Sequence, residues 1–119
     1  MLDKVLRIGL LYDFYGALLT EKQQRCLEMH YLNDDSLGEI ALAHDVSRQA
    51  VYDILRRAEQ ILVDYEAKLG LVERYQQERE TLNKVYGLIE SLPVAEHQLP
   101  PIKQALEMLQ GLINREEED

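Results

Sequence analysis

Five polar residues between positions 47 and 53 have the side-chain types and spacing needed to contact nucleic-acid bases. They are Ser47, Arg48, Gln49, Tyr52 and Asp53. An arginine can form two hydrogen bonds with one guanine, and a glutamine can form two with one adenine. Residues three and four apart share a face of a helix. The pattern therefore predicts an outward helix face that enters a major groove and contacts base edges.

Four basic residues are candidates for contacts with the phosphate backbone. Arg56 and Arg57 follow on the same predicted helix, whereas Lys22 and Arg25 lie on an earlier one. Contacts with phosphates position a protein on a duplex without specifying its sequence. The alternative interpretation is that an outward Arg48-Gln49 pair at a helix start is ordinary solvated surface, and that the helix pair is only a packing unit.

Two capping boxes indicate the helices that would position these side chains. Thr20 with Gln23, and Ser36 with Glu39, each have the pattern in which side chains satisfy free backbone N–H groups at a helix start. The first of these helices is predicted to end near Tyr31, before a turn. The second is short, and another helix follows it closely, so the sequence predicts a helix-turn-helix within residues 20–62.

The helix-turn-helix has suitable residues at its sterically demanding positions. Ala41 is small enough for two helices to cross closely, and Val46 would fill the turn. Ser47 would cap the next helix, which Val51 and Ile54 would anchor to the core. This arrangement leaves the candidate base-contacting residues on the outward face.

Helix-like apolar spacing also extends on both sides of this motif. A first helix is predicted with one buried stripe consisting of Val5, Leu6, Ile8, Leu11, Phe14, Tyr15 and Leu18. The helix that begins at Ser47 is predicted to bury residues as far as Leu69 and to break at Gly70. It would be roughly 33 Å long at 1.5 Å per residue, which is longer than a three-helix core needs.

The C-terminal half is predicted to be helical over 71–91 and 102–114, with a proline-bounded loop between. The fold class is therefore all-α: a helix-turn-helix bundle with an elongated third helix and a C-terminal helical extension. We expect a helix-turn-helix domain at 1–66, an oligomerisation or packing segment at 67–115, and a frayed acidic tail at 116–119. A homodimer or higher homo-oligomer would cover the overlong helix. Alternatively, the C-terminal half folds back on the same chain and the protein is monomeric.

The charge of the chain opposes simple attraction to a polyanion. Thirteen Lys and Arg against 22 Asp and Glu give a net charge of −9. A nucleic-acid binder normally gains affinity by neutralising phosphates and releasing counterions. Binding to DNA must therefore depend on a local basic patch, on oligomerisation or on a partner. The sequence has no signal-peptide pattern and no apolar run of membrane-spanning length, so we expect a soluble cytoplasmic protein.

Residues that could support catalysis or bind a cofactor do not form a recognisable motif. His30, His44 and His97 fall in different elements, and none of the pairs has metal-ligand spacing. Cys26 is most simply a small buried apolar side chain. The glycines are scattered singly, so there is no phosphate-binding loop. We expect neither a metal nor a cofactor, and we do not expect an enzyme.

The motif segments resemble a known family. Leu19-Thr20-Glu21-Lys22-Gln23, Ser36-Leu37-Gly38-Glu39-Ile40-Ala41 and Val46-Ser47-Arg48-Gln49-Ala50-Val51-Tyr52-Asp53 are similar to region four of bacterial sigma factors. With Leu11-Tyr12-Asp13-Phe14-Tyr15 upstream, they resemble the YlxM-like family of small helix-turn-helix proteins. The resemblance implies an all-helical fold, DNA binding and a link to the signal recognition particle pathway.

Two functions are consistent with the sequence. In the first, the protein is a DNA-binding regulator in which residues 47–53 contact bases and the arginines hold phosphates. In the second, it is a non-enzymatic adaptor that binds a basic protein or an RNA through the same helical surface. The acidity of the chain favours a basic protein partner over a polyanion. The outward face of residues 48–57 distinguishes the two functions.

Overall fold

The structure is a computed structural model that describes residues 2–118, with side chains described for residues 3–114. Over this range it contains helices and no strand, which confirms the all-α prediction. The chain divides into two compact units, one ending at Val72 and one beginning at Glu73. Val72, the last residue of the first unit, is buried in its core.

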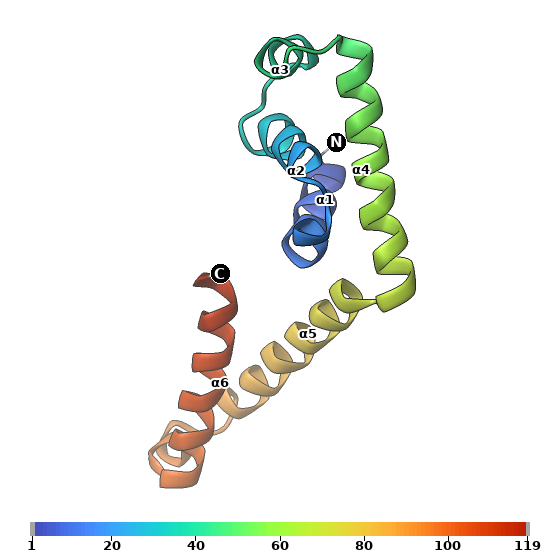
Figure 1. Cartoon of the computed structure of the whole chain (residues 1–119). Helices are drawn as coiled ribbons and strands as arrows, with labels where there is room; N and C mark the ends of the chain where they lie inside the picture. The colour runs from blue at the N-terminus through green and yellow to red at the C-terminus, as the bar shows by residue number, and fades with distance from the viewer. Residues whose placement is uncertain (1, 119) are drawn as a thin grey trace. The chain divides into compact units, whose positions relative to one another are not determined.

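The first unit consists of four α-helices with two short irregular helices (Figure 1). The helices α1, α2 and α3 each pack against the long helix α4. In chain order the elements are α1 (Leu2–Tyr15), η1 (Gly16–Leu18), α2 (Glu21–Leu27), η2 (Glu28–Leu32), α3 (Leu37–His44) and α4 (Arg48–Leu69). Both predicted capping boxes are present, at Thr20 and at Ser36.

The core of the first unit is formed by residues from every one of its α-helices. Its buried members are Ile8, Leu11, Tyr15, Leu19, Cys26, Leu27, Ile40, Ala41, Val51, Leu55, Ala58, Leu62 and Val72. In α4 the buried side chains recur at spacings of three and four, so one stripe of this helix faces the other helices. The long helix therefore serves as the support for the rest of the unit.

The stripe of buried residues predicted for the first helix includes more residues than the structure buries. Four of its members are exposed: Val5, Leu6, Phe14 and Leu18. The chain leaves the α-helix at Gly16 and enters the 3₁₀ turn η1, which places Leu19 rather than Leu18 in the core. Gly16 is required at this turn, because an added Cβ would lie 2.9 Å from the ring of Tyr12. Leu69 is also exposed, contrary to prediction, because it is the last residue of α4.

The end of α4 is fixed by a hydrogen-bonded cluster around Tyr15. Gly70 terminates the helix in the left-handed conformation (φ 62°), as predicted for this break. The Tyr15 hydroxyl donates to Glu66 Oε1 at 2.6 Å and accepts from the backbone N–H of Leu71 at 3.1 Å. The N–H of Val72 donates to Glu66 Oε1 at 3.0 Å. Free N–H groups at the start of the following helix are thus satisfied by α1 and α4.

The second unit consists of two α-helices joined by a short irregular helix. Helix α5 (Leu71–Glu90) begins in the first unit and continues into the second, followed by η3 (Val94–Gln98) and α6 (Pro100–Glu118). Helix α6 starts at Pro100 and extends beyond its predicted end near Asn114, because Arg and Glu continue a helix well. The expectation of a frayed tail at 116–119 stays untested, since Asp119 and the side chains of 115–118 lie outside the described residues.

Candidate nucleic-acid interface

Helices α3 and α4 are joined by a tight turn, as predicted. Asp45 occupies the left-handed conformation with φ 53°, where an L-residue other than asparagine or aspartate would be more strained. The N–H of Val46 donates to the carbonyl of Ala41 at 3.0 Å. Val46 packs against the core, and Ala41 is buried where the two helices meet. The turn therefore holds the first residues of α4 in a defined orientation.

Ser47 immediately precedes α4 and caps the start of this helix with its side chain. Its Oγ accepts a hydrogen bond from the N–H of Ala50 at 3.0 Å. Such a cap stabilises a helix by about 0.5–2 kcal/mol. Ser47 is exposed, so it lies at the outer surface of the helix-turn-helix, but its hydroxyl is already engaged within the protein.

Arg48 is exposed, and its side chain lies back towards α3. A Cβ added to Gly38 would lie 3.2 Å from Nε of Arg48, so the guanidinium group passes over the first turn of α3. Gln49 and Asp53 contact one another, with the Gln49 amide donating to Asp53 Oδ1 at 3.2 Å. Tyr52 is 47% exposed. The predicted base-contacting residues are thus gathered on one surface, and several already contact protein groups.

Arg56 and Arg57 lie one turn further along α4, on its exposed side. Within the range for which side chains are described, neither guanidinium group forms a hydrogen bond or an ion pair. Together with Asp53 and Gln60 they line a shallow open groove of about 470 Å³. Their N–H donors are therefore available to an external acceptor such as a phosphate.

A second cleft, of about 440 Å³, lies on the other side of Tyr52 and Arg56. It brings residues from α1 and η2 next to α4, and its lining residues are Lys4, His30, Tyr31, Leu37, Tyr52, Leu55, Arg56 and Glu59. Glu59 accepts a hydrogen bond from the Tyr31 hydroxyl and lies 3.9 Å from the Lys4 ammonium nitrogen. Burial and the neighbouring Glu59 raise the pKa of Tyr31, so its hydroxyl stays protonated and donates.

Lys4 and His30 lie beside α4, a position that the sequence did not predict. They are far from residues 48–57 in sequence, and no local spacing pattern predicts this tertiary neighbourhood. Lys22 and Arg25, which were predicted to hold phosphates, lie on α2 outside the two clefts that Arg56 lines. Arg25 pairs with Glu21 at 2.6 Å on its own helix. The structure therefore groups Arg56 with Lys4 and His30 more closely than with the α2 cations.

The described residues contain no group of three or more His, Cys, Asp or Glu side chains placed to hold a metal ion. His30 Nδ1 lies 3.2 Å from the carbonyl oxygen of Asp35. Cys26 is a free, fully buried cysteine, and burial raises the pKa of its thiol, which disfavours the nucleophilic thiolate. None of the helices over residues 2–118 combines the length and the apolar character needed to cross a membrane.

The capped turn between α3 and α4, with α4 exposed on its outer side, defines a helix-turn-helix protein. The comparisons agree. A family model described as "Putative helix-turn-helix protein, YlxM / p13 like" matches residues 2–111, and the chain belongs to this UPF0122 family.

Similar proteins come from several bacteria. The UPF0122 protein of Geobacillus kaustophilus (strain HTA426) is 45% identical over 109 residues, covering 92% of this chain and 99% of that protein. The one from Shouchella clausii (strain KSM-K16) is 47% identical over 115 residues, covering 97% and 95%. The one from Thermoanaerobacter sp. (strain X514) is 57% identical over 88 residues, covering 74% and 75%.

Proposed function

We propose that the protein is a DNA-binding regulatory protein that inserts the N-terminal half of α4 into a major groove. The observation that carries this proposal is the set of free arginine donors on the exposed side of α4. Residues 47–57 contain three arginines and one aspartate, which gives a local charge of 3 − 1 = +2 in a chain of net charge −9. The local charge has the sign that attraction to phosphates requires.

The acidic side chains of α4 contact other partners, so they do not form ion pairs with the arginines of this helix. Asp53 accepts from Gln49, and Asp64 accepts from Gln60 at 2.9 Å. Glu59 is held by Tyr31 and lies near Lys4. In the proposed complex, Arg48, Gln49 and Tyr52 contact bases, while Arg56 and Arg57 hold phosphates.

Two substitutions of Ser47 test whether the start of α4 approaches DNA. Ser47→Asp keeps an efficient helix cap but adds a negative charge next to the proposed duplex. We therefore expect unchanged thermal stability and a loss of duplex affinity of about tenfold, which corresponds to roughly 1.4 kcal/mol. Ser47→Ala serves as the converse control, because it removes the cap without adding charge. It should lower the free energy of unfolding by about 1 kcal/mol.

The measurements are thermal unfolding followed by circular dichroism and duplex binding followed by fluorescence anisotropy. If Ser47→Asp binds duplex DNA as tightly as the unaltered chain, α4 does not approach the phosphates with its N-terminal end. The proposed docking geometry would then be wrong.

A second candidate function is a non-enzymatic adaptor, and one surface feature favours it. Leu42, on α3 beside the turn, is 85% exposed and borders a groove that also contains Val46 and Arg48. An exposed apolar side chain next to charged ones suits a protein partner better than a phosphate backbone. Under this function the acidic chain would bind a basic protein, or an RNA, through α3 and α4. The link to the signal recognition particle pathway, implied by resemblance alone, stays a prediction under either function.

A further inference from the structure

Helices α5 and α6 carry side chains at alternating spacings of three and four residues that are only half-buried. In α5 these positions are Tyr75, Arg79, Leu82, Tyr86 and Ile89, and in α6 they are Ile102, Leu106, Leu109 and Ile113. We refer to these nine residues as the helix seam. A three-four alternation is the spacing of the two core positions of a heptad, through which helices pack side by side in bundles and coiled coils.

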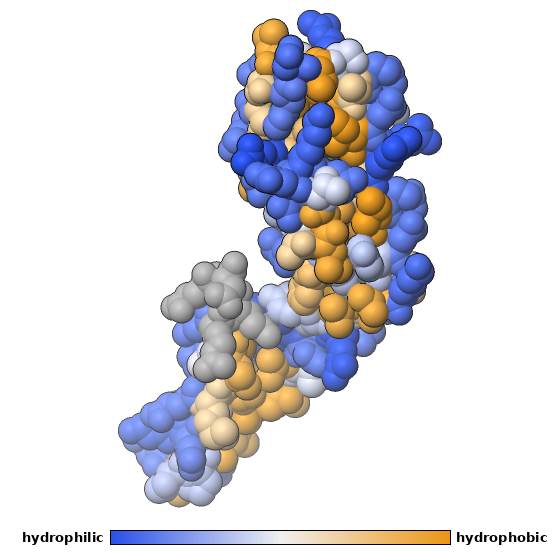
Figure 2. Space-filling model, in the orientation of Figure 1, coloured by the Kyte–Doolittle hydropathy of each residue, from blue (hydrophilic) through white to orange (hydrophobic). Residues whose placement is uncertain are grey.

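The second unit does not bury its seam by itself. Of the side chains described from residue 73 to residue 114, none is buried, whereas all thirteen core residues lie at or before Val72. Apolar residues beside the seam are exposed: Val85, Leu88, Met108 and Leu112. Figure 2 shows apolar surface where Figure 1 places α5 and α6. A unit this small is only marginally stable by itself, so another apolar surface against the seam would stabilise it.

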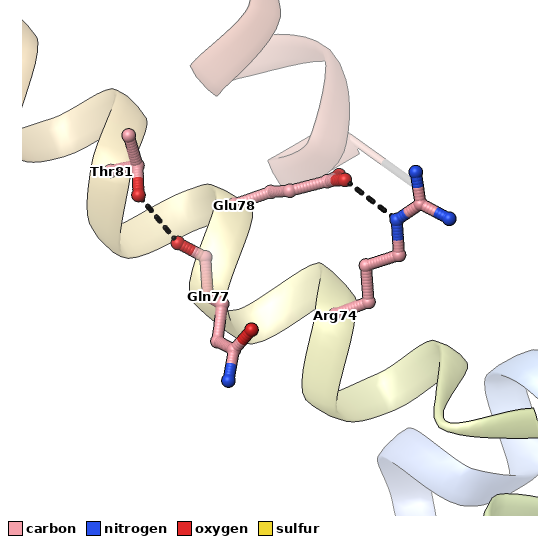
Figure 3. Close-up of polar contacts among 4 residues, drawn as sticks. All are labelled: Arg74, Gln77, Glu78 and Thr81. Carbon is pink, nitrogen blue, oxygen red and sulfur yellow. Dashed lines mark hydrogen bonds and ion pairs between the residues drawn. The ribbon is translucent and has the colours of Figure 1, made fainter.

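The charge of α5 favours a second copy of the chain as that surface. Residues 71–90 carry three basic and four acidic side chains, a net charge of 3 − 4 = −1 in a chain of −9. Two copies of an acidic protein repel one another least when they meet through surfaces that carry almost no net charge. The polar side of α5 is internally balanced, with Arg74 Nε donating to Glu78 at 3.1 Å and Thr81 Oγ1 donating to the Gln77 carbonyl at 3.0 Å (Figure 3). A basic partner would prefer the more acidic surfaces elsewhere.

Arg79 is a charged residue within the otherwise largely apolar seam, and it would make association through the seam specific. It is the second of the five α5 positions of the seam. It donates to the Tyr75 hydroxyl at 3.5 Å, and its guanidinium carbon lies 5.8 Å from the centre of the Tyr75 ring. A single polar or charged residue in an otherwise apolar heptad core costs stability but fixes the register and the number of helices. A residue of this kind favours an assembly with a defined number of helices over non-specific association of apolar surfaces.

We propose that two copies of this chain associate through the helix seam, with α5 and α6 of each copy forming an intermolecular helical bundle. The area that the two helices offer is of the same order as the area that a stable dimer buries. Helices of 20 and 19 residues are about 30 and 28 Å long, and with a contact face roughly 10 Å wide they offer about 600 Å² of projected area. A stable interface buries about 800 Å² of accessible surface on each partner. This inference concerns the second unit and does not depend on DNA binding.

The test is the mass of the full chain in solution, measured by sedimentation equilibrium over a wide range of concentration. We expect twice the chain mass of 13.9 kDa. Leu82→Glu and Leu109→Glu each place a charge in the seam and should produce a monomer. Leu109→Met, which keeps an apolar side chain, should remain a dimer. Gln77→Glu adds the same charge on the exposed polar side of α5 and should also remain a dimer.

Circular dichroism controls for misfolding of the variants. We expect the first unit to unfold cooperatively in each of them. A monomeric unaltered chain, or seam variants that remain dimers, would overturn the inference. The result is separable from the proposed function. A dimer that fails to bind any duplex contradicts DNA binding alone, and a monomer that binds a defined duplex contradicts the seam alone.

Discussion

Replacing Tyr15 with alanine is expected to lower the free energy of unfolding of the first unit by about 3–5 kcal/mol, the cost of truncating a buried aromatic residue. Tyr15 is 1% exposed and stacks on Tyr65 with ring centroids 5.8 Å apart. Its hydroxyl also joins α1 to Glu66 and to the N–H of Leu71. The substitution therefore leaves a cavity and removes the partner of a backbone donor. Urea unfolding followed by circular dichroism measures the change.

Tyr15→Phe separates the ring from the hydroxyl. Burial and the hydrogen bond to Glu66 raise the pKa of Tyr15, so the hydroxyl remains protonated and can donate throughout the neutral range. Phenylalanine keeps the packing but leaves the Leu71 N–H without this acceptor, which should cost about 1–3 kcal/mol. Equal losses for alanine and phenylalanine would show that the ring contributes nothing. A loss below about 1 kcal/mol for alanine would contradict a core role for Tyr15.

Replacing Arg56 and Arg57 together with alanine is expected to weaken binding to duplex DNA by roughly 100-fold. Each charge-assisted hydrogen bond to a phosphate is worth about 1.5 kcal/mol or more, and 1.4 kcal/mol is a factor of ten. The slope of log affinity against log salt concentration should also decrease by about two, because two fewer counterions are released. Both side chains are exposed, so stability should change little. Anisotropy titrations at several salt concentrations measure affinity and slope together.

A matched double variant controls for the loss of two positive charges. Arg74 and Lys84 are exposed on α5, away from the positions of the helix seam. Arg74→Ala with Lys84→Ala changes the net charge by the same amount and should leave the salt slope nearly unchanged. If this control weakens binding as much as the α4 double variant, general charge determines affinity and the α4 face has no special part in it.

The local structure around the helix-turn-helix could be predicted because it depends on short-range chemistry. The two capping boxes, the cap at Ser47 and the break at Gly70 each follow from residues within a few positions of one another. Ala41 and Val46 were predicted at the crossing and in the turn by size alone, and both pack against the core. Short-range patterns of this kind need no knowledge of the tertiary fold.

The stripe of α1 and the neighbours of α4 could not be predicted in the same way. Periodicity showed which residues of α1 are apolar, but not that η1 would rotate Leu18 outward and Leu19 inward. The approach of Lys4 and His30 to Arg56 joins three elements that are distant in sequence. The direction of the Arg48 side chain, over Gly38, depends on how α3 lies against α4. These features are set by packing, which overrides local pattern.

Recognition of duplex DNA by α4 is tested by selecting duplexes from a random-sequence pool with the purified protein, at low and then physiological salt. We expect recovery of a defined sequence whose binding survives physiological salt and is lost in the Arg56→Ala, Arg57→Ala variant. Recovery of no common sequence, or of binding that disappears as salt rises, would contradict autonomous DNA recognition. That result would favour the adaptor function, in which α3 and α4 contact a basic protein.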